Sequence, residues 1–243
     1  MDKPITLVEH LVELRKRIII CLIGLGLACL LSLPFASFLL KILKEPATTT
    51  IGKLAFFSPE EPFLIYMRLA FLSGWIISLP VILYQLWLFI SPALDESVKK
   101  YSSYFIIICF LAFISGAIFA YFLLIPPALK FLLSFAKEDL EAVISANKYI
   151  SFITGLIFAS GLVFQMPVLS FILARLGIIN SRILRRKYRY AIVIVFIVAA
   201  IITPTPDAFN MSLLALPMLL LYEVSVWVAF FASKGITYGA KRT

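Results

Sequence analysis

The sequence predicts an all-α, polytopic membrane protein with six transmembrane helices. Of its 243 residues, 62% are hydrophobic and only 14% are charged, and the mean hydropathy of +1.03 is far from the composition of a soluble globular domain. Apolar segments follow one another at residues 18–40, 63–90, 101–125, 149–176, 190–202 and 209–231. We expect them to form a single integral membrane domain over residues 1–243.

The first four segments are long enough to cross a bilayer, and the last two are predicted to be short. A helix needs about 20 apolar residues to span about 30 Å of hydrocarbon. The fifth segment ends at the double-proline run 203–207, and Glu223 interrupts the sixth. Short helices form a re-entrant hairpin or span a thinned bilayer, and we favour thinning because the charge count below needs both crossings. Prolines within the apolar runs predict bent helices in a curved, glove-like bundle: Pro34, Pro80, Pro167 and Pro217.

The distribution of Lys and Arg predicts that both termini are cytoplasmic. The chain carries 22 basic and 13 acidic residues. Fifteen of the basic residues lie in the N-terminal arm, loop 91–100, residues 175–189 and the C-terminal tail, whereas six lie in the intervening loops. Because cytoplasmic loops of membrane proteins accumulate Lys and Arg, the richer side is the cytoplasm. In the poorer loops, residues 58–63 (SPEEPF) predict a helix start, and residues 125–127 (IPP) predict a bend followed by a helix at 129–136.

Residues 6–20 predict a helix that passes from a charged, amphipathic half into an apolar half. Thr6 and Glu9 have the spacing of a capping box. Glu13 stands four residues before Arg17, the favourable order for an intrahelical pair. Two interpretations remain: Glu13 is the internal partner of Arg17, or it belongs to a binding surface for a cationic ligand at the membrane surface.

Polar side chains at membrane depth are costly unless paired, and they are candidates for function. Gln165 is either an interhelical hydrogen-bonding group or a docking group. Asp207 is either the cap of the sixth helix or a functional carboxylate. Glu223 is a functional group or lies half solvated near the cytoplasmic end of its helix.

Catalytic chemistry has no motif in this chain. There is one His, and Cys21, Cys29 and Cys109 lie separately inside apolar runs, so we expect no disulfide, no metal site, no cofactor and no enzyme activity. A small-solute secondary transporter is the alternative class, but the sequence has neither paired ionisable groups at mid-membrane nor visible repeated halves.

Several motifs together resemble the TatC family, the receptor subunit of the twin-arginine protein translocase. The first is HLVELR at residues 10–15. The match continues in order along nearly the whole chain, and the long run at 80–94 is very specific. Its further segments are SPEEPF at 58–63, PVILYQLWLFISPAL at 80–94, FAYF at 119–122, FQMP at 164–167, TP with Asp207 at 203–207, ALPM at 215–218 and LYE at 221–223.

The resemblance implies a receptor of the bacterial cytoplasmic membrane that binds twin-arginine signal peptides of folded proteins. It implies assembly with TatA- and TatB-type single-span partners, self-association in a receptor complex, and transport driven by the proton gradient. It also implies candidate intramembrane partner contacts at Gln165, Asp207 and Glu223. The signal-peptide surface expected from it comprises His10, Leu11, Glu13, Arg15, Arg17, Phe89, Leu94, Asp95 and Glu96.

The sequence departs from the family pattern at two positions. Family members use a second Glu after the Pro-Ala-Leu of the first cytoplasmic loop, where this chain has Val98, and Asp95 and Glu96 are the possible replacements. Many relatives carry Glu in the fourth span where this chain has Gln165, so a polar contact is retained and its charge is lost.

Overall fold

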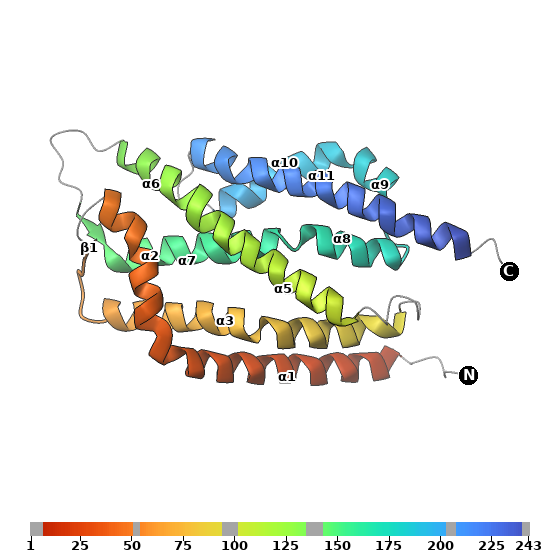
Figure 1. Ribbon diagram of the computed structural model, residues 1–243, viewed down its shortest axis with the longest axis horizontal. Helices are drawn as coiled ribbons and strands as arrows, with labels where there is room; N and C mark the ends of the chain where they lie inside the picture. The colour runs from red at the N-terminus through yellow and green to blue at the C-terminus, as the bar shows by residue number, and fades with distance from the viewer. Residues whose placement is uncertain (1–6, 51–53, 94–101, 135–142, 203–207, 240–243) are drawn as a thin grey trace. The chain divides into compact units, whose positions relative to one another are not determined.

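The computed structural model describes residues 7–50, 54–93, 102–134, 143–202 and 208–239, and it confirms the all-α prediction (Figure 1). The helices and turns before the middle of the chain are α1 (Leu7–Ser32), the 3-10 turn η1 (Leu33–Phe35), α2 (Ala36–Thr50), α3 (Glu61–Ile90), η2 (Ser91–Ala93) and α5 (Ser102–Phe119). After them come the π-helical η3 (Ala120–Leu124), α6 (Ile125–Ser134), α7 (Ala146–Val163), α8 (Met166–Arg175), α9 (Ser181–Arg186), α10 (Tyr188–Ile202) and α11 (Ala208–Gly239). Two short strands, β1 (Leu54–Ala55) and β2 (Ile144–Ser145), pair in parallel.

Within the described ranges, five helical stretches are long and apolar enough to cross a membrane, which confirms a polytopic protein. They are Val8–Thr48, Glu61–Ile90, Tyr104–Ser134, Ala146–Arg175 and Met211–Ser233. The fifth predicted segment is a shorter apolar helix, Tyr188–Ile202, as expected. The prediction of a short last helix is wrong, because α11 continues for 32 residues through Glu223, whose carboxylate pairs with Arg185. The glove-like curvature and the single membrane domain stay predictions.

Two of the predicted spans contain breaks that the apolar pattern hides. The first, residues 18–40, is divided because α1 ends at Ser32 and η1 follows with Pro34 in its first turn. The fourth, residues 149–176, is divided at Phe164 and Gln165, and Pro167 lies in the first turn of α8. Proline lacks a backbone donor and is tolerated in the first turn of a helix. After each break, the proline lies in the first turn of the next helical segment.

The third span passes through two prolines without ending. The π-helical segment η3 precedes them, and the Ile125 N–H donates to the Ala120 carbonyl. Pro126 and Pro127 then occupy the first turn of α6, where missing N–H groups are best tolerated. The helix predicted at residues 129–136 is therefore present as far as Ser134, where the described residues end, and it continues directly from the third span (Figure 1).

The chain divides into two compact units, residues 1–40 with 66–110 and residues 41–65 with 111–243. In the first unit, α1 and α3 approach closely at Gly74, where an added Cβ would lie 2.5 Å from the Cys29 sulfur and 2.7 Å from its Cα. The buried Ser32 hydroxyl lies 2.8 Å from the Cys29 carbonyl oxygen and 2.7 Å from that of Ala70. A glycine and a serine thus let two apolar helices pack backbone to backbone, as small residues do in membranes.

In the second unit, two tyrosine hydroxyls bind carbonyl groups of α2 one turn before an internal proline. Pro46 has no N–H to donate to the Ile42 carbonyl one turn earlier. The Tyr121 hydroxyl donates to that carbonyl oxygen at 2.9 Å, and the buried Tyr149 hydroxyl donates to the Leu43 carbonyl oxygen at 2.9 Å. An unpaired carbonyl is costly in an apolar environment, so these phenols stabilise the interrupted helix.

The predicted helix start at residues 58–63 is confirmed by α3, which begins at Glu61 with Pro62 in its first turn. The Ser58 hydroxyl donates to the Glu60 carboxylate at 2.8 Å, and this bond, together with a backbone hydrogen bond, lowers the pKa of Glu60. The buried Glu61 carboxylate instead accepts from the Ser145 hydroxyl at 3.3 Å. Ser145 also caps α7 by accepting from the Lys148 N–H.

Candidate functional site

Helix α1 presents three polar side chains of the HLVELR region on the face that meets α3. The predicted helix is present from Leu7, while Thr6 of the proposed capping box lies outside the described residues. His10, Glu13 and Arg17 follow at spacings of three and four, so they share one face of the helix. The carboxyl-terminal end of α3, which carries the PVILYQLWLF motif, supplies the other half of the site.

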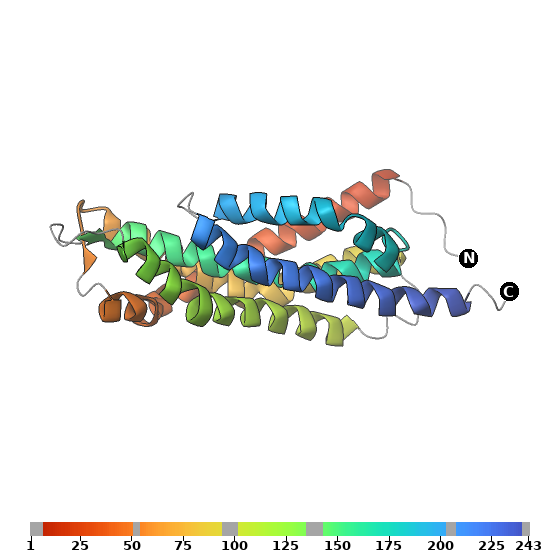
Figure 2. The ribbon, with the colours of Figure 1, turned by 90° about the horizontal axis from the view of Figure 1, so that it is seen from above.

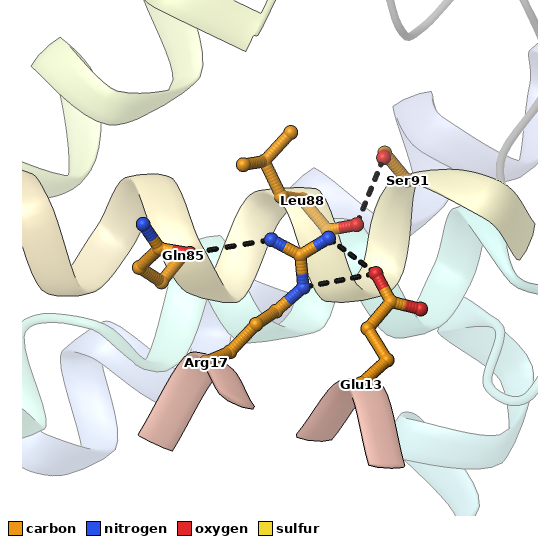
Figure 3. A network of polar contacts seen from close by, with 5 residues as sticks. All are labelled: Glu13, Arg17, Gln85, Leu88 and Ser91. Carbon is orange, nitrogen blue, oxygen red and sulfur yellow. Dashed lines mark hydrogen bonds and ion pairs between the residues drawn. The ribbon is translucent and has the colours of Figure 1, made fainter. Parts of the chain in front are cut away.

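The Arg17 guanidinium joins the two helices. Its Nε donates to Glu13 Oε1 at 3.0 Å, and its Nη2 also pairs with that oxygen. Its Nη1 donates to the side-chain oxygen of Gln85 in α3 at 3.2 Å (Figure 3). The Arg17 and Glu13 side chains are only 19% and 28% exposed, so this is a half-buried pair. The predicted intrahelical pair is confirmed, with an additional amide partner.

One oxygen of the Glu13 carboxylate accepts both of these bonds. In Figure 3, Oε2 has no interaction with the other residues drawn. Among the described residues, Oε2 takes part in no hydrogen bond or ion pair. An ionised carboxylate offers about four acceptor positions on its two oxygens. Glu13 therefore keeps acceptor capacity for a further donor while Arg17 holds its side chain in place.

An aromatic pair flanks the network. The His10 and Phe89 rings stack with centroids 4.3 Å apart and an interplanar angle of 17°. Both side chains are half-buried. On the following turn, the Ser91 hydroxyl donates to the Leu88 carbonyl oxygen at 3.2 Å (Figure 3). His10, Glu13, Arg17, Gln85 and Phe89, which we call the α1–α3 site, are thus gathered at one end of the first unit.

The remaining candidates for signal-peptide contact lie partly on the exposed side of α1 and partly outside the described residues. Leu11 and Arg15 lie on the exposed side of α1, and 64% of Leu11 is accessible. Leu94, Asp95 and Glu96, with Val98, lie outside the described residues. Gln85 is a member of the site that the sequence interpretation missed. An amide within the apolar run PVILYQLWLF was the available signal.

Three intramembrane candidates have different outcomes. Glu223 Oε1 accepts from Arg185 Nη2 at 2.8 Å, and the side chains are 38% and 60% exposed, which agrees with a half-solvated Glu223. Gln165 is the half-buried N-cap residue of α8, and its side chain makes no capping bond. Asp207 lies outside the described residues.

Metal ligation has no support in the described ranges, where no group of three His, Cys, Asp or Glu side chains could hold an ion. The three cysteines are not paired in disulfides.

Comparison with known proteins assigns the family. The family model described as "Sec-independent protein translocase protein (TatC)" matches residues 9–217. This chain belongs to the TatC family. It is 39% identical to the Sec-independent protein translocase protein TatC of Carboxydothermus hydrogenoformans, over 95% of each chain. It is 40% identical to TatC of Aquifex aeolicus, with 94% of this chain and 96% of that protein covered.

A crystal structure of the twin-arginine translocase receptor TatC has the same fold. It superposes with a TM-score of 0.83 at 38% identity and covers 93% of this chain and 100% of that one. TatC proteins are multi-pass components of the bacterial inner membrane and are not enzymes, and the membrane-length helices described above agree with this assignment. The chain is thus a component of the Sec-independent, twin-arginine protein translocase.

Proposed function

We propose that the α1–α3 site binds the arginine pair of twin-arginine signal peptides, with Glu13 as the acceptor for one arginine. The observation that carries this proposal is that the half-buried Glu13 carboxylate already binds a guanidinium, that of Arg17. Its second oxygen, Oε2, can accept from another guanidinium, because a carboxylate binds donors through both oxygens.

Arg17 and Gln85 position Glu13 rather than receive the peptide. Arg17 occupies Oε1 and is itself held by the Gln85 amide oxygen, which fixes the carboxylate on the face toward α3. The incoming guanidinium then pairs with Oε2. Because the site is half-buried, this charge-assisted contact contributes more than an exposed surface pair, about 1–3 kcal/mol.

Neighbouring groups would accommodate the rest of the signal. The stacked His10 and Phe89 rings provide an apolar wall, and exposed Leu11 and Arg15 extend the surface along α1. We propose Asp95 or Glu96 as the contact of the second arginine, in place of the family Glu at the position of Val98. Either carboxylate can substitute for the other, so the double alanine variant tests this contact. Unchanged affinity of that variant would leave one acidic contact rather than two.

Charge and family support a proposal for the orientation and the partners. The Lys and Arg bias supports cytoplasmic termini, and a Tat component is expected to assemble with TatA- and TatB-type single-span proteins for export driven by the proton gradient. In a background that lacks the native cysteines, Ser181→Cys should react with an impermeant thiol reagent only from the cytoplasm. Val143→Cys, 60% exposed at the parent residue, should react from outside. Labelling of Ser181→Cys from outside would remove the orientation.

The experiment that tests the proposed function measures signal-peptide affinity on the purified, full-length chain in nanodiscs. Glu13→Gln keeps the shape and hydrogen-bonding capacity of the side chain but removes its charge. It should lower the affinity for a fluorescent twin-arginine peptide by about 5- to 150-fold. Glu9→Gln is the matched control, because Glu9 lies one turn earlier on the same helix and is exposed. Equal peptide affinity of the parent chain and Glu13→Gln would return Glu13 to a purely intrahelical role.

A further inference from the structure

The second unit contains a groove that the recognition of signal peptides does not use. It lies beside the amino-terminal part of α10, bordered by α8 and α11, and has a volume of about 410 Å³. Figure 2 shows α10 running beside α11 in this unit. The inner wall is apolar and is formed by Met166, Ala191 and Val195, of which Val195 is only 3% exposed.

One wall of the groove is held rigidly. The Tyr222 hydroxyl donates to the Leu184 carbonyl oxygen at 2.8 Å, so the phenol is committed to the fold. Its ring meets that of Tyr188 edge to face, with centroids 5.6 Å apart. The groove is therefore a formed feature of the α9–α11 packing.

The rim of the groove is cationic. Lys187 lines it, with Nζ 5.3 Å from the centroid of the Tyr190 ring. The adjoining segment 181–189 contains five basic residues and no acidic one, and all five are exposed: Arg182, Arg185, Arg186, Lys187 and Arg189. Glu223 pairs with Arg185 alone, so the rim keeps an excess of positive charge.

We propose that this groove binds an anionic phospholipid, with a hydrocarbon chain along Ala191 and Val195 and the phosphate at Lys187. An apolar groove with cations at one end matches the two parts of such a lipid, and basic pockets between membrane helices on the cytoplasmic side bind anionic headgroups. Exposed Tyr190 suits the headgroup level, where amphipathic rings gather. The Lys and Arg bias assigns this end of α10 to the cytoplasmic leaflet.

The dimensions of the groove favour a lipid chain over a partner helix. Along α9 and α10, its lining runs only from Lys187, the C-cap residue of α9, to Val195 of α10, about two and a half helical turns. A helix with its side chains is about 10 Å across, and a groove of about 410 Å³ does not enclose one along that length. A twin-arginine peptide is excluded by charge, because its cations would meet the cationic rim.

The test is a lipid titration of the purified full-length chain in detergent, followed by native mass spectrometry. The parent chain should bind phosphatidylglycerol more tightly than phosphatidylcholine. Lys187→Gln should weaken the binding of phosphatidylglycerol about fivefold, which is the effect of one cation near a headgroup. The binding of phosphatidylcholine should not change. Lys130→Gln is the matched control, since Lys130 is an exposed cation of α6 in the same unit.

A second variant tests the apolar part of the groove. Ile194 lines the groove and is 58% exposed. Ile194→Trp therefore fills the groove without disturbing the core, and it should weaken the binding of both lipids. Equal binding of the two lipids by the parent, or equal loss in Lys187→Gln and Lys130→Gln, would overturn the proposal. The proposal would also be overturned if Lys187→Gln and Ile194→Trp weakened the binding of a synthetic partner transmembrane peptide and left lipid binding unchanged.

Discussion

The ion pair Glu13–Arg17 and the ion pair Glu223–Arg185 have the same chemistry in different surroundings. In the first, the side chains are 28% and 19% exposed and the guanidinium also bonds Gln85. In the second, they are 38% and 60% exposed. The first pair is thus a half-buried network between α1 and α3, whereas the second is a surface contact between α9 and α11.

The charge around each pair also differs, and this difference separates two kinds of recognition. At the α1–α3 site, Glu13 keeps one carboxylate oxygen for a further donor. Glu223 pairs with Arg185, one of five exposed basic residues in the segment 181–189. We propose a cationic ligand for Glu13 of the first unit and an anionic ligand for Lys187 of the second, although each unit contains an Arg–Glu pair.

The largest expected effect that sharpens this comparison is on stability. Arg17→Ala leaves the half-buried Glu13 and Gln85 without their shared partner, and it should lower the free energy of unfolding by about 1–3 kcal/mol. Arg185→Ala breaks an exposed pair and should cost about 0–1 kcal/mol. Thermal unfolding in detergent, followed by tryptophan fluorescence, compares the two variants. Equal losses would mean that burial does not distinguish the pairs.

A smaller effect is expected at Gln165, which we propose as a docking group for a single-span partner. Replacing the amide in Gln165→Leu should remove an interhelical hydrogen bond, which is worth about 0.6–2 kcal/mol in membranes. Copurification of a TatA- or TatB-type partner should fall, and peptide binding at the α1–α3 site should stay unchanged. Loss of peptide binding with intact copurification would assign Gln165 to the signal path or to the fold.

The helices and the Glu13–Arg17 pair could be predicted from sequence because both depend on local spacing. Hydropathy located the membrane segments, and the separation of four residues identified the pair. Hydropathy alone did not show the breaks at Leu33–Phe35 and Gln165, but the prolines Pro34 and Pro167 predicted a bend at each of them.

The partners that join different helices could not be predicted in this way. Gln85 lies 68 residues from Arg17, and Arg185 lies 38 residues from Glu223. No local pattern encodes such contacts, which depend on how the helices pack. The short-helix prediction failed for the same reason, because Arg185 pairs with the carboxylate that was expected to end the apolar stretch of α11.

The measurement that tests the central claim most directly is a double-mutant cycle between Glu13 and the signal peptide. Parent and Glu13→Gln chains are titrated with the twin-arginine peptide and with peptides in which either arginine is replaced by Gln, and Glu223→Gln serves as the control chain. We predict a coupling energy of about 1–3 kcal/mol between Glu13 and one arginine, and none with Glu223. Additive effects of Glu13→Gln and both peptide substitutions would contradict the assignment of Glu13 as the arginine acceptor.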